Sequence, residues 1–241
     1  MLTFKDNKKD PILIDANKII VGIGVIAVLL PLIVHLAAFP LKDCVHGTMH
    51  SISAYYHTDA ENILVGLICA LAFSFLAYNG HSKTDMIFSK IAAFSALGLA
   101  LIPTSIFEGE YSCIEPDGSS IREYIHLACA VILLLTMAVF SLFIFTHREE
   151  GVPIHPRKKF FYRFYGITIL VSLGLIAVYV IFLKDIYPDL SQKQPIFWLE
   201  SICLVAFGSS WLLKSKLFDS KKKAEVEKNE NVMHQILNKD K

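Results

Sequence analysis

The stretch "IIVGIGVIAVLLPLIVHLAAF", residues 19–39, decides the fold, because it contains no Asp, Glu, Lys or Arg. A helix needs about 20 such residues to cross the roughly 30 Å of hydrocarbon in a bilayer. The apolar core of a cleaved signal peptide is shorter, about 7 to 15 residues, and an A-x-A site follows it. No such site follows residue 39. The stretch therefore predicts a retained transmembrane helix.

Five more apolar runs follow along the chain. Hydrophobic residues make up 54% of the 241 residues, charged residues make up 19%, and the mean hydropathy is +0.50. These values lie well to the apolar side of soluble domains. The sequence predicts an all-α fold, a polytopic membrane six-helix bundle in residues 18–213, with helices at 19–39, 63–78, 91–107, 124–146, 164–183 and 196–213.

The second run is the shortest, so we expect its helix to begin nearer Asn62 or Ala60, with Thr58 or Asp59 as the N-cap. Small residues inside the runs let helix backbones approach closely in lipid. We expect helix contacts at Gly22, Gly24, Gly66, Gly98, Gly174 and Gly208. Aromatic residues near run ends are typical of an interfacial belt. Those near run ends here are Tyr162, Tyr165, Tyr179, Tyr187, Trp198 and Trp211.

The basic residues are segregated although the net charge is only +1. With the N-terminus inside, 19 of the 23 Lys and Arg residues fall on the inner side. The positive-inside rule then places both termini in the cytoplasm of a bacterial inner (plasma) membrane. Residues 1–17 form a leader and residues 214–241 a charged tail, which could attract anionic lipid. This charge pattern indicates no nucleic-acid partner.

Polar side chains of five helices, with His35 from the first, and of the loop that precedes the second, meet at the outer level. Ionisable groups at membrane depth tend to face a bundle interior or a wet cavity. The sequence therefore predicts an outward-facing polar pocket. The alternative is that His126 and Glu200 are interfacial residues that reach toward water. The pocket candidates are Ser53, Tyr56, Asn62, Thr104, His126 and Glu200.

The segment "HGTMHSISAYYHT", residues 46–58, gathers three histidines in the first outer loop. On a helix, His46, His50 and His57 would share one face and could supply three nitrogens to Zn²⁺. The HxxxH pair lacks the glutamate of HExxH motifs, and as plain loop residues these histidines would act as a pH sensor. No GxSxG motif surrounds Ser53, so the sequence assigns no catalytic residue.

The cysteines fall into two groups. Cys44 and Cys113 lie in the first two outer loops, on the oxidising side of a plasma membrane, and predict a disulfide. Cys69, Cys129 and Cys203 fall inside predicted helices and are expected to be reduced core residues.

Several stretches, "SISAYYHT", "YNG", "ALGLALIPTS", "FSLFIFT" and "FWLESICLVAFGSSWLLKS", are similar to an uncharacterised bacterial family of multi-pass membrane proteins of unknown function. The resemblance covers most of residues 51–215 and implies no activity. Where the family pattern has a basic-acidic pair after the threonine, this chain has Glu61 and Asn62. The residues that carry the resemblance are Ser51, Ser53, Tyr55, Tyr56, Pro103, Thr104, Glu200 and Trp211.

A looser likeness is to the CREST superfamily of membrane hydrolases, in which Ser, His and Asp on several of seven helices hold zinc. The superfamily also has an HxxxH pair in its final helix. This chain has six predicted helices, and its HxxxH pair lies in a loop, so the likeness is one of shape.

Three functions fit the sequence. They are the binding or sensing of a ligand or proton, metal-assisted hydrolysis of a lipid-like substrate, and a structural or accessory role in the membrane.

Overall fold

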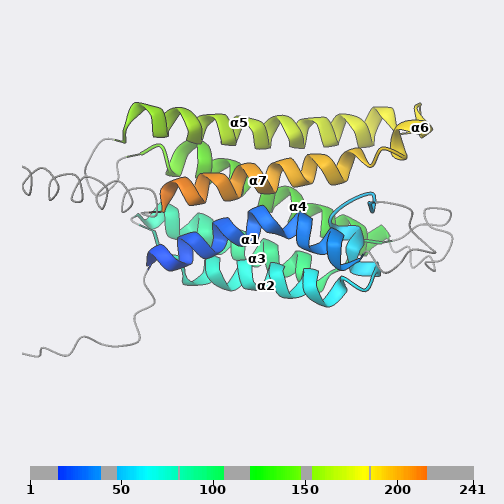
Figure 1. Ribbon diagram of the computed structural model, residues 1–241, viewed down its shortest axis with the longest axis horizontal. Coiled ribbons are helices and arrows are strands. Elements are labelled where there is room, and N and C mark those ends of the chain that lie inside the picture. The colour runs from blue at the N-terminus through cyan, green and yellow to red at the C-terminus, as the bar shows by residue number, and fades with distance from the viewer. Residues whose placement is uncertain are drawn as a thin grey trace, which may run out of the picture.

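The computed structural model describes residues 16–38, 48–80, 82–105, 120–147, 154–184 and 186–215 (Figure 1). Within these ranges the chain is helical and contains no strand, so the all-α prediction is confirmed. The long helices are α1 (Ala16–Ala37), α2 (Glu61–Ala77), α3 (Lys83–Leu101), α4 (Ser120–Val139), α5 (Pro156–Val178) and α7 (Pro195–Lys214). Shorter elements are the 3₁₀ helix η1 (Ser53–His57), the π-helices η2 (Phe140–Ile144) and η3 (Tyr179–Leu183), and α6 (Pro188–Ser191).

Five of the described helices are long and apolar enough to cross a membrane. The other long helix, α2, has 17 residues. At about 1.5 Å per residue it measures about 25 Å, slightly less than the hydrocarbon thickness. The chain therefore forms an all-α polytopic bundle, as the apolar runs predict.

Several predicted helix boundaries are wrong. Helix α5 begins at Pro156 and not near residue 164, and α4 begins at Ser120 and not near residue 124. Helix α3 begins well before residue 91, because the Ser82 side chain accepts a hydrogen bond from the Asp85 backbone N–H at 3.1 Å and caps the helix. It ends at Leu101, two residues before Pro103. The N-cap of α2 is Ala60 rather than Thr58 or Asp59. The Thr58 hydroxyl instead accepts a hydrogen bond from the Ala60 N–H at 3.2 Å.

The long helices form a closed ring in chain order. Each packs against the next, and α7 returns to pack against both α1 and α5 (Figure 1). Helices α1 and α7 run antiparallel, so the start of α1 and the end of α7 lie at the same end of the bundle. Helix α5 lies at the edge, with much of its apolar surface exposed.

Glycines bring the backbones of α1 and α7 into contact. A Cβ added at Gly208 would lie 2.6 Å from the Gly24 carbonyl oxygen and 2.9 Å from the Val28 backbone nitrogen. The prediction of helix contacts at glycines is therefore confirmed here, and also at Gly98, where a Cβ would lie 2.5 Å from Cys129 Sγ. It is wrong at three positions, where an added Cβ would meet nothing within 4 Å: Gly22, Gly66 and Gly174.

Trp211 belongs to a buried aromatic cluster and not to an interfacial belt. Its side chain is fully buried, and its ring centroid lies 5.7 Å from that of Phe75 and 5.2 Å from that of Phe145. Tyr162 and Tyr179 are buried as well. The belt prediction is therefore wrong for these residues, because the ends of α5 and α7 pack inward.

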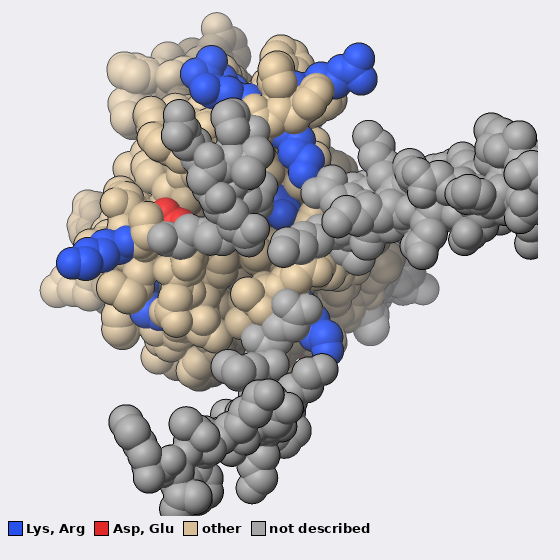
Figure 2. All heavy atoms as spheres, turned by 90° about the vertical axis from the view of Figure 1, so that its left-hand side faces the viewer, with Lys and Arg blue, Asp and Glu red and all other residues tan. Residues whose placement is uncertain are grey.

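Basic side chains gather at the end of the bundle where α1, α3 and α5 begin and α7 ends, which we call the basic end (Figure 2). The acidic side chain that the structure describes there is Asp85. At the opposite end the described basic side chains are Arg122, Lys184 and Lys193. Those at the basic end are Lys18, Lys83, Lys90, Arg157, Lys158, Lys159, Arg163 and Lys214.

Candidate functional site

A buried segment, residues 48–57, enters the end of the bundle opposite the basic end. Met49, Ala54 and Tyr55 within it are at most 1% exposed. Two hydrogen bonds hold its backbone against α7. The Phe197 N–H donates to the His50 carbonyl oxygen at 3.0 Å, and the Ile52 N–H donates to Glu200 Oε2 at 2.6 Å. Glu200 thus supplies an acceptor to a backbone N–H in a region where water is scarce.

Tyr55 joins this segment to α1. Its hydroxyl accepts a hydrogen bond from the Met49 N–H at 3.4 Å and is hydrogen-bonded to His35 Nδ1 at 2.9 Å. The ring centroid of Phe197 lies 5.9 Å from that of Tyr55. Burial raises the pKa of Tyr55, and the Met49 hydrogen bond opposes this effect. The Tyr55 hydroxyl therefore stays protonated, and its role is to connect the segment to α1.

We expect Tyr55→Phe to lower the free energy of unfolding by about 1–3 kcal/mol, because the buried Met49 N–H and His35 ring would lose a partner. Thermal unfolding of the detergent-purified protein measures this loss. Tyr56→Phe is the matched control, since Tyr56 is only partly buried. Equal melting temperatures for the Tyr55 variant and the control would contradict the role assigned to the Tyr55 hydroxyl.

A second group of polar side chains ties the end of α3 to the start of α4. Glu123 Oε2 accepts hydrogen bonds from the Ser105 N–H at 2.7 Å and the Thr104 hydroxyl at 3.0 Å. His57 Nε2 is hydrogen-bonded to the Thr104 carbonyl oxygen at 2.7 Å, and His126 Nδ1 to that of Ile102 at 2.6 Å. These groups satisfy backbone atoms that the early end of α3 leaves without helical partners.

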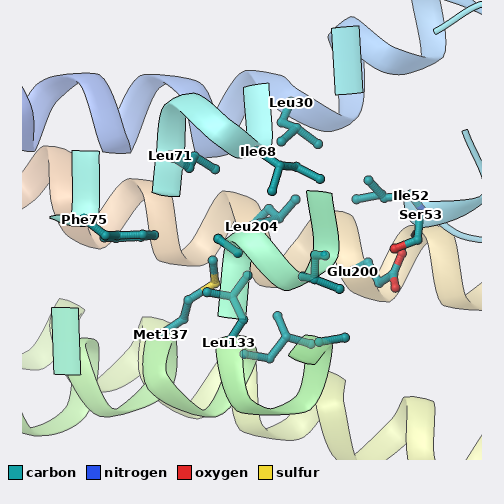
Figure 3. Close-up of a pocket in the computed structure, with 14 residues that line it drawn as sticks. Leu30, Ile52, Ser53, Ile68, Leu71, Phe75, Leu133, Met137, Glu200 and Leu204 are labelled. Atoms are coloured by element: carbon teal, nitrogen blue, oxygen red, sulfur yellow. Dashed lines mark hydrogen bonds between the residues drawn. The ribbon is translucent and has the colours of Figure 1, made fainter. Parts of the chain in front are cut away.

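A cavity runs from residues 52–53 into the bundle interior (Figure 3). Its volume is about 70 Å³. Figure 3 shows Ser53 and Glu200 together at one end, with Phe75 and Met137 toward the other. Of the lining residues, Ser53 and Glu200 carry polar side chains, and the rest are apolar: Leu30, Ile52, Ile68, Leu71, Phe75, Ala96, Leu99, Ala130, Leu133, Leu134, Met137 and Leu204.

The structure divides the predicted pocket residues. Ser53 and Glu200 line the cavity together. Thr104 and His126 are buried in the α3–α4 group. Tyr56 packs against His57, with ring centroids 5.7 Å apart, and Asn62 is exposed at the start of α2. None of these four lines this cavity.

The described residues contain no group of three His, Cys, Asp or Glu side chains placed to hold a metal ion. His50 and His57 do not share a face of one α-helix, because the chain bends at residues 50–52 before η1 begins. His46, Cys44 and Cys113 lie outside the described residues, and so does most of the predicted charged tail. Cys69, Cys129 and Cys203 are free thiols.

Glu123 is a polar residue of this end that is absent from the predicted pocket. It lies one turn before His126 on α4, and its partners become visible only once α3 is known to end at Leu101. Comparison with protein families, curated proteins and solved structures found no match to this chain, so the resemblance to the uncharacterised family stays a prediction.

Proposed function

We propose that this membrane protein binds a single-chain amphiphile, with the polar head at Ser53 and Glu200 and the alkyl chain along the apolar cavity. The observation that carries the proposal is the distribution of polarity in that cavity, since both polar side chains lie at one end. Ligand sites of this kind combine apolar walls with a few polar groups that orient the ligand.

The shape of the cavity favours one alkyl chain. Along α2 its lining extends from Ile68 to Phe75, a length of about 10 Å at about 1.5 Å per residue. A volume of about 70 Å³ spread over that length is narrow. A compact ring system would need the helices to separate, whereas an extended chain follows the space that is already present.

The polar end favours a head group that donates hydrogen bonds. Glu200 Oε2 accepts one hydrogen bond from Ile52, and a carboxyl group has further acceptor positions on its two oxygens. The Ser53 hydroxyl beside it can donate or accept. An amine or alcohol therefore suits this end, and a carboxylate head would place two acidic groups together.

Native mass spectrometry of the purified full chain tests this preference with three probes of equal chain length: octylamine, octanol and octanoic acid. We expect one equivalent of the amine or alcohol to bind, with octanoic acid at least about tenfold weaker, a difference of about 1.4 kcal/mol. Equal binding of all three probes, or preference for the acid, would contradict the proposal.

The cavity opens toward the outer side in this proposal, with both termini in the cytoplasm of a bacterial plasma membrane. Two observations support it. Basic residues gather at one end, as the positive-inside rule requires. The start of α1 and the end of α7 share that end, so the number of crossings between them is even. Helix α2 then provides the sixth crossing.

Cysteine labelling tests this topology. In a variant that lacks the five native cysteines, we expect Asp189→Cys, exposed in α6, to react with a membrane-impermeant maleimide in intact cells. Thr84→Cys, exposed near the start of α3, should react only after permeabilisation. The reverse pattern would invert the bundle in the membrane.

A further inference from the structure

A groove lies at the basic end, between the last turns of the α4–η2 helix and the first turns of α5. Its volume is about 480 Å³, much larger than that of the first cavity. Its described lining contains three groups that can carry positive charge and no carboxylate. The lining residues are Leu142, Phe143, Thr146, His147, Lys159, Arg163 and Ile167.

The backbone gives this groove its shape. At Gly166 the two helices touch, because a Cβ there would lie 2.3 Å from Leu142 Cγ and 3.1 Å from the Leu142 backbone nitrogen. Lys159 and Arg163 lie about two turns and one turn nearer the basic end. On the other wall, η2 is a π-helix with a hydrogen bond from the Phe145 N–H to the Phe140 carbonyl oxygen at 2.9 Å. Single π-turns inside helices occur frequently at functional sites.

The groove is divided into a charged part and an apolar part. Lys159 and Arg163 are four residues apart, so they lie on the same face of α5, and His147 ends the opposite wall. His147 Nδ1 is hydrogen-bonded to the Phe143 carbonyl oxygen at 2.5 Å, which leaves Nε2 as the ring nitrogen for a ligand. Phe143 and Ile167 lie about one turn farther from the basic end than His147 and Arg163, and their side chains are 59% and 54% exposed.

We propose that this groove binds an anionic phospholipid of the leaflet at the basic end. Arg163 and Lys159 contact the phosphate, and an acyl chain lies over Phe143 and Ile167. Arginine suits phosphate because its guanidinium presents paired N–H donors, and lysine adds a point charge. Basic pockets between transmembrane helices on the cytoplasmic side are suited to anionic head groups. The exposed apolar wall favours a lipid over free phosphate, because free phosphate has no apolar part to pack against it.

Native mass spectrometry of the delipidated full chain tests the site with phosphatidylglycerol and phosphatidylcholine. We expect the wild type to bind the first at least roughly tenfold more tightly, and the Lys159→Gln/Arg163→Gln variant to lose that preference. Lys18→Gln/Lys83→Gln makes the same charge change at exposed positions of the same end and should keep it. Arg163→Lys keeps the charge without the paired donors and should give an intermediate preference.

Three results would overturn this inference. One is equal binding of the two lipids by the wild type. Another is an equal loss of preference in both double variants, which would indicate general attraction to the basic end. The third is displacement of phosphatidylglycerol by inorganic phosphate at comparable concentration, which would show a site for free phosphate. The site does not depend on the amphiphile cavity, so Glu200 variants should leave this preference unchanged.

Discussion

Gly208→Val is expected to lower the free energy of unfolding by about 3 kcal/mol, the upper end of the usual cost of overpacking. Even the first carbon of the new side chain would lie 2.6 Å from the Gly24 carbonyl oxygen and 2.9 Å from the Val28 backbone nitrogen. A flexible side chain could turn away, but these are backbone atoms of α1. Helices α1 and α7 must therefore separate, which opens the ring that encloses the cavity.

Thermal unfolding of the detergent-purified protein measures this effect, which should amount to a fall in melting temperature of about 6–12 °C at about 2–4 °C per kcal/mol. Gly174→Val on α5 is the matched control, because an added Cβ there meets nothing within 4 Å. Both variants carry the same cost in helix propensity. A melting temperature for Gly208→Val within 2 °C, roughly, of the control would show that the α1–α7 contact is looser than described.

Glu200→Leu is expected to have the second large effect, on stability and on binding together. The Ile52 N–H would lose its acceptor at 2.6 Å, and an unsatisfied buried donor costs about 1–3 kcal/mol. The head group of a bound amine would lose the same carboxyl group. Glu200→Gln keeps an oxygen for Ile52 but removes the carboxylate, so it should fold normally and bind octylamine at least about tenfold more weakly.

Glu123→Gln is the matched control for the Glu200 variants. Glu123 is a carboxyl group at the same end of the bundle, but it accepts hydrogen bonds from Ser105 and Thr104 and does not line the cavity. The Glu123→Gln variant should bind octylamine like the wild type. If Glu200→Gln and Glu123→Gln weakened binding equally, the amine would be responding to the charge of this end and not to the cavity.

The sequence predicted the class of fold well because the signal is simple. Runs of apolar residues of bilayer length leave few alternatives to helices, since every backbone polar group in lipid needs a partner within the protein. The boundaries were harder. The apolar run at 91–107 continued past the end of α3, and the cap at Ser82 lay in a polar stretch outside it.

The candidate site was only partly predictable. The sequence predicts Glu200 as a pocket residue because ionisable groups at membrane depth tend to face a bundle interior or a cavity, and Ser53 because it lies in the polar loop at the same outer level. Nothing in the sequence distinguished them from His126 and Thr104, which satisfy the end of α3 instead. That distinction depends on where α3 ends. The cavity itself is space left by packing between five helices and the segment at residues 52–53, and no local pattern encodes it.

The π-helix that ends α4 supplies part of the lining of the groove at Arg163, and no sequence motif marks this change of helix type. The hydrolase and accessory interpretations stay predictions. His57 Nε2 and His126 Nδ1 are hydrogen-bonded to backbone carbonyl oxygens, and Ser53 lies beside Glu200. These contacts support the proposal of ligand binding.

The measurement that tests the central claim most directly is quenching of Trp211 fluorescence by an amphiphile with bromine at the end of its chain. Phe75 lines the inner part of the cavity and packs against Trp211, with ring centroids 5.7 Å apart. Trp211 is fully buried, and Trp198→Phe removes the other tryptophan, which is exposed. A bromine at the inner end of the cavity would therefore reach Trp211 from within the protein.

We predict that 8-bromooctylamine quenches Trp211 in a saturable manner in the Trp198→Phe protein. Unbrominated octylamine should compete with this quenching, and 8-bromooctanoic acid should produce little of it. If the brominated amine and the brominated acid quenched Trp211 equally, or neither did so, then the chain would not lie in this cavity with its head at Glu200, and the proposed function would be wrong.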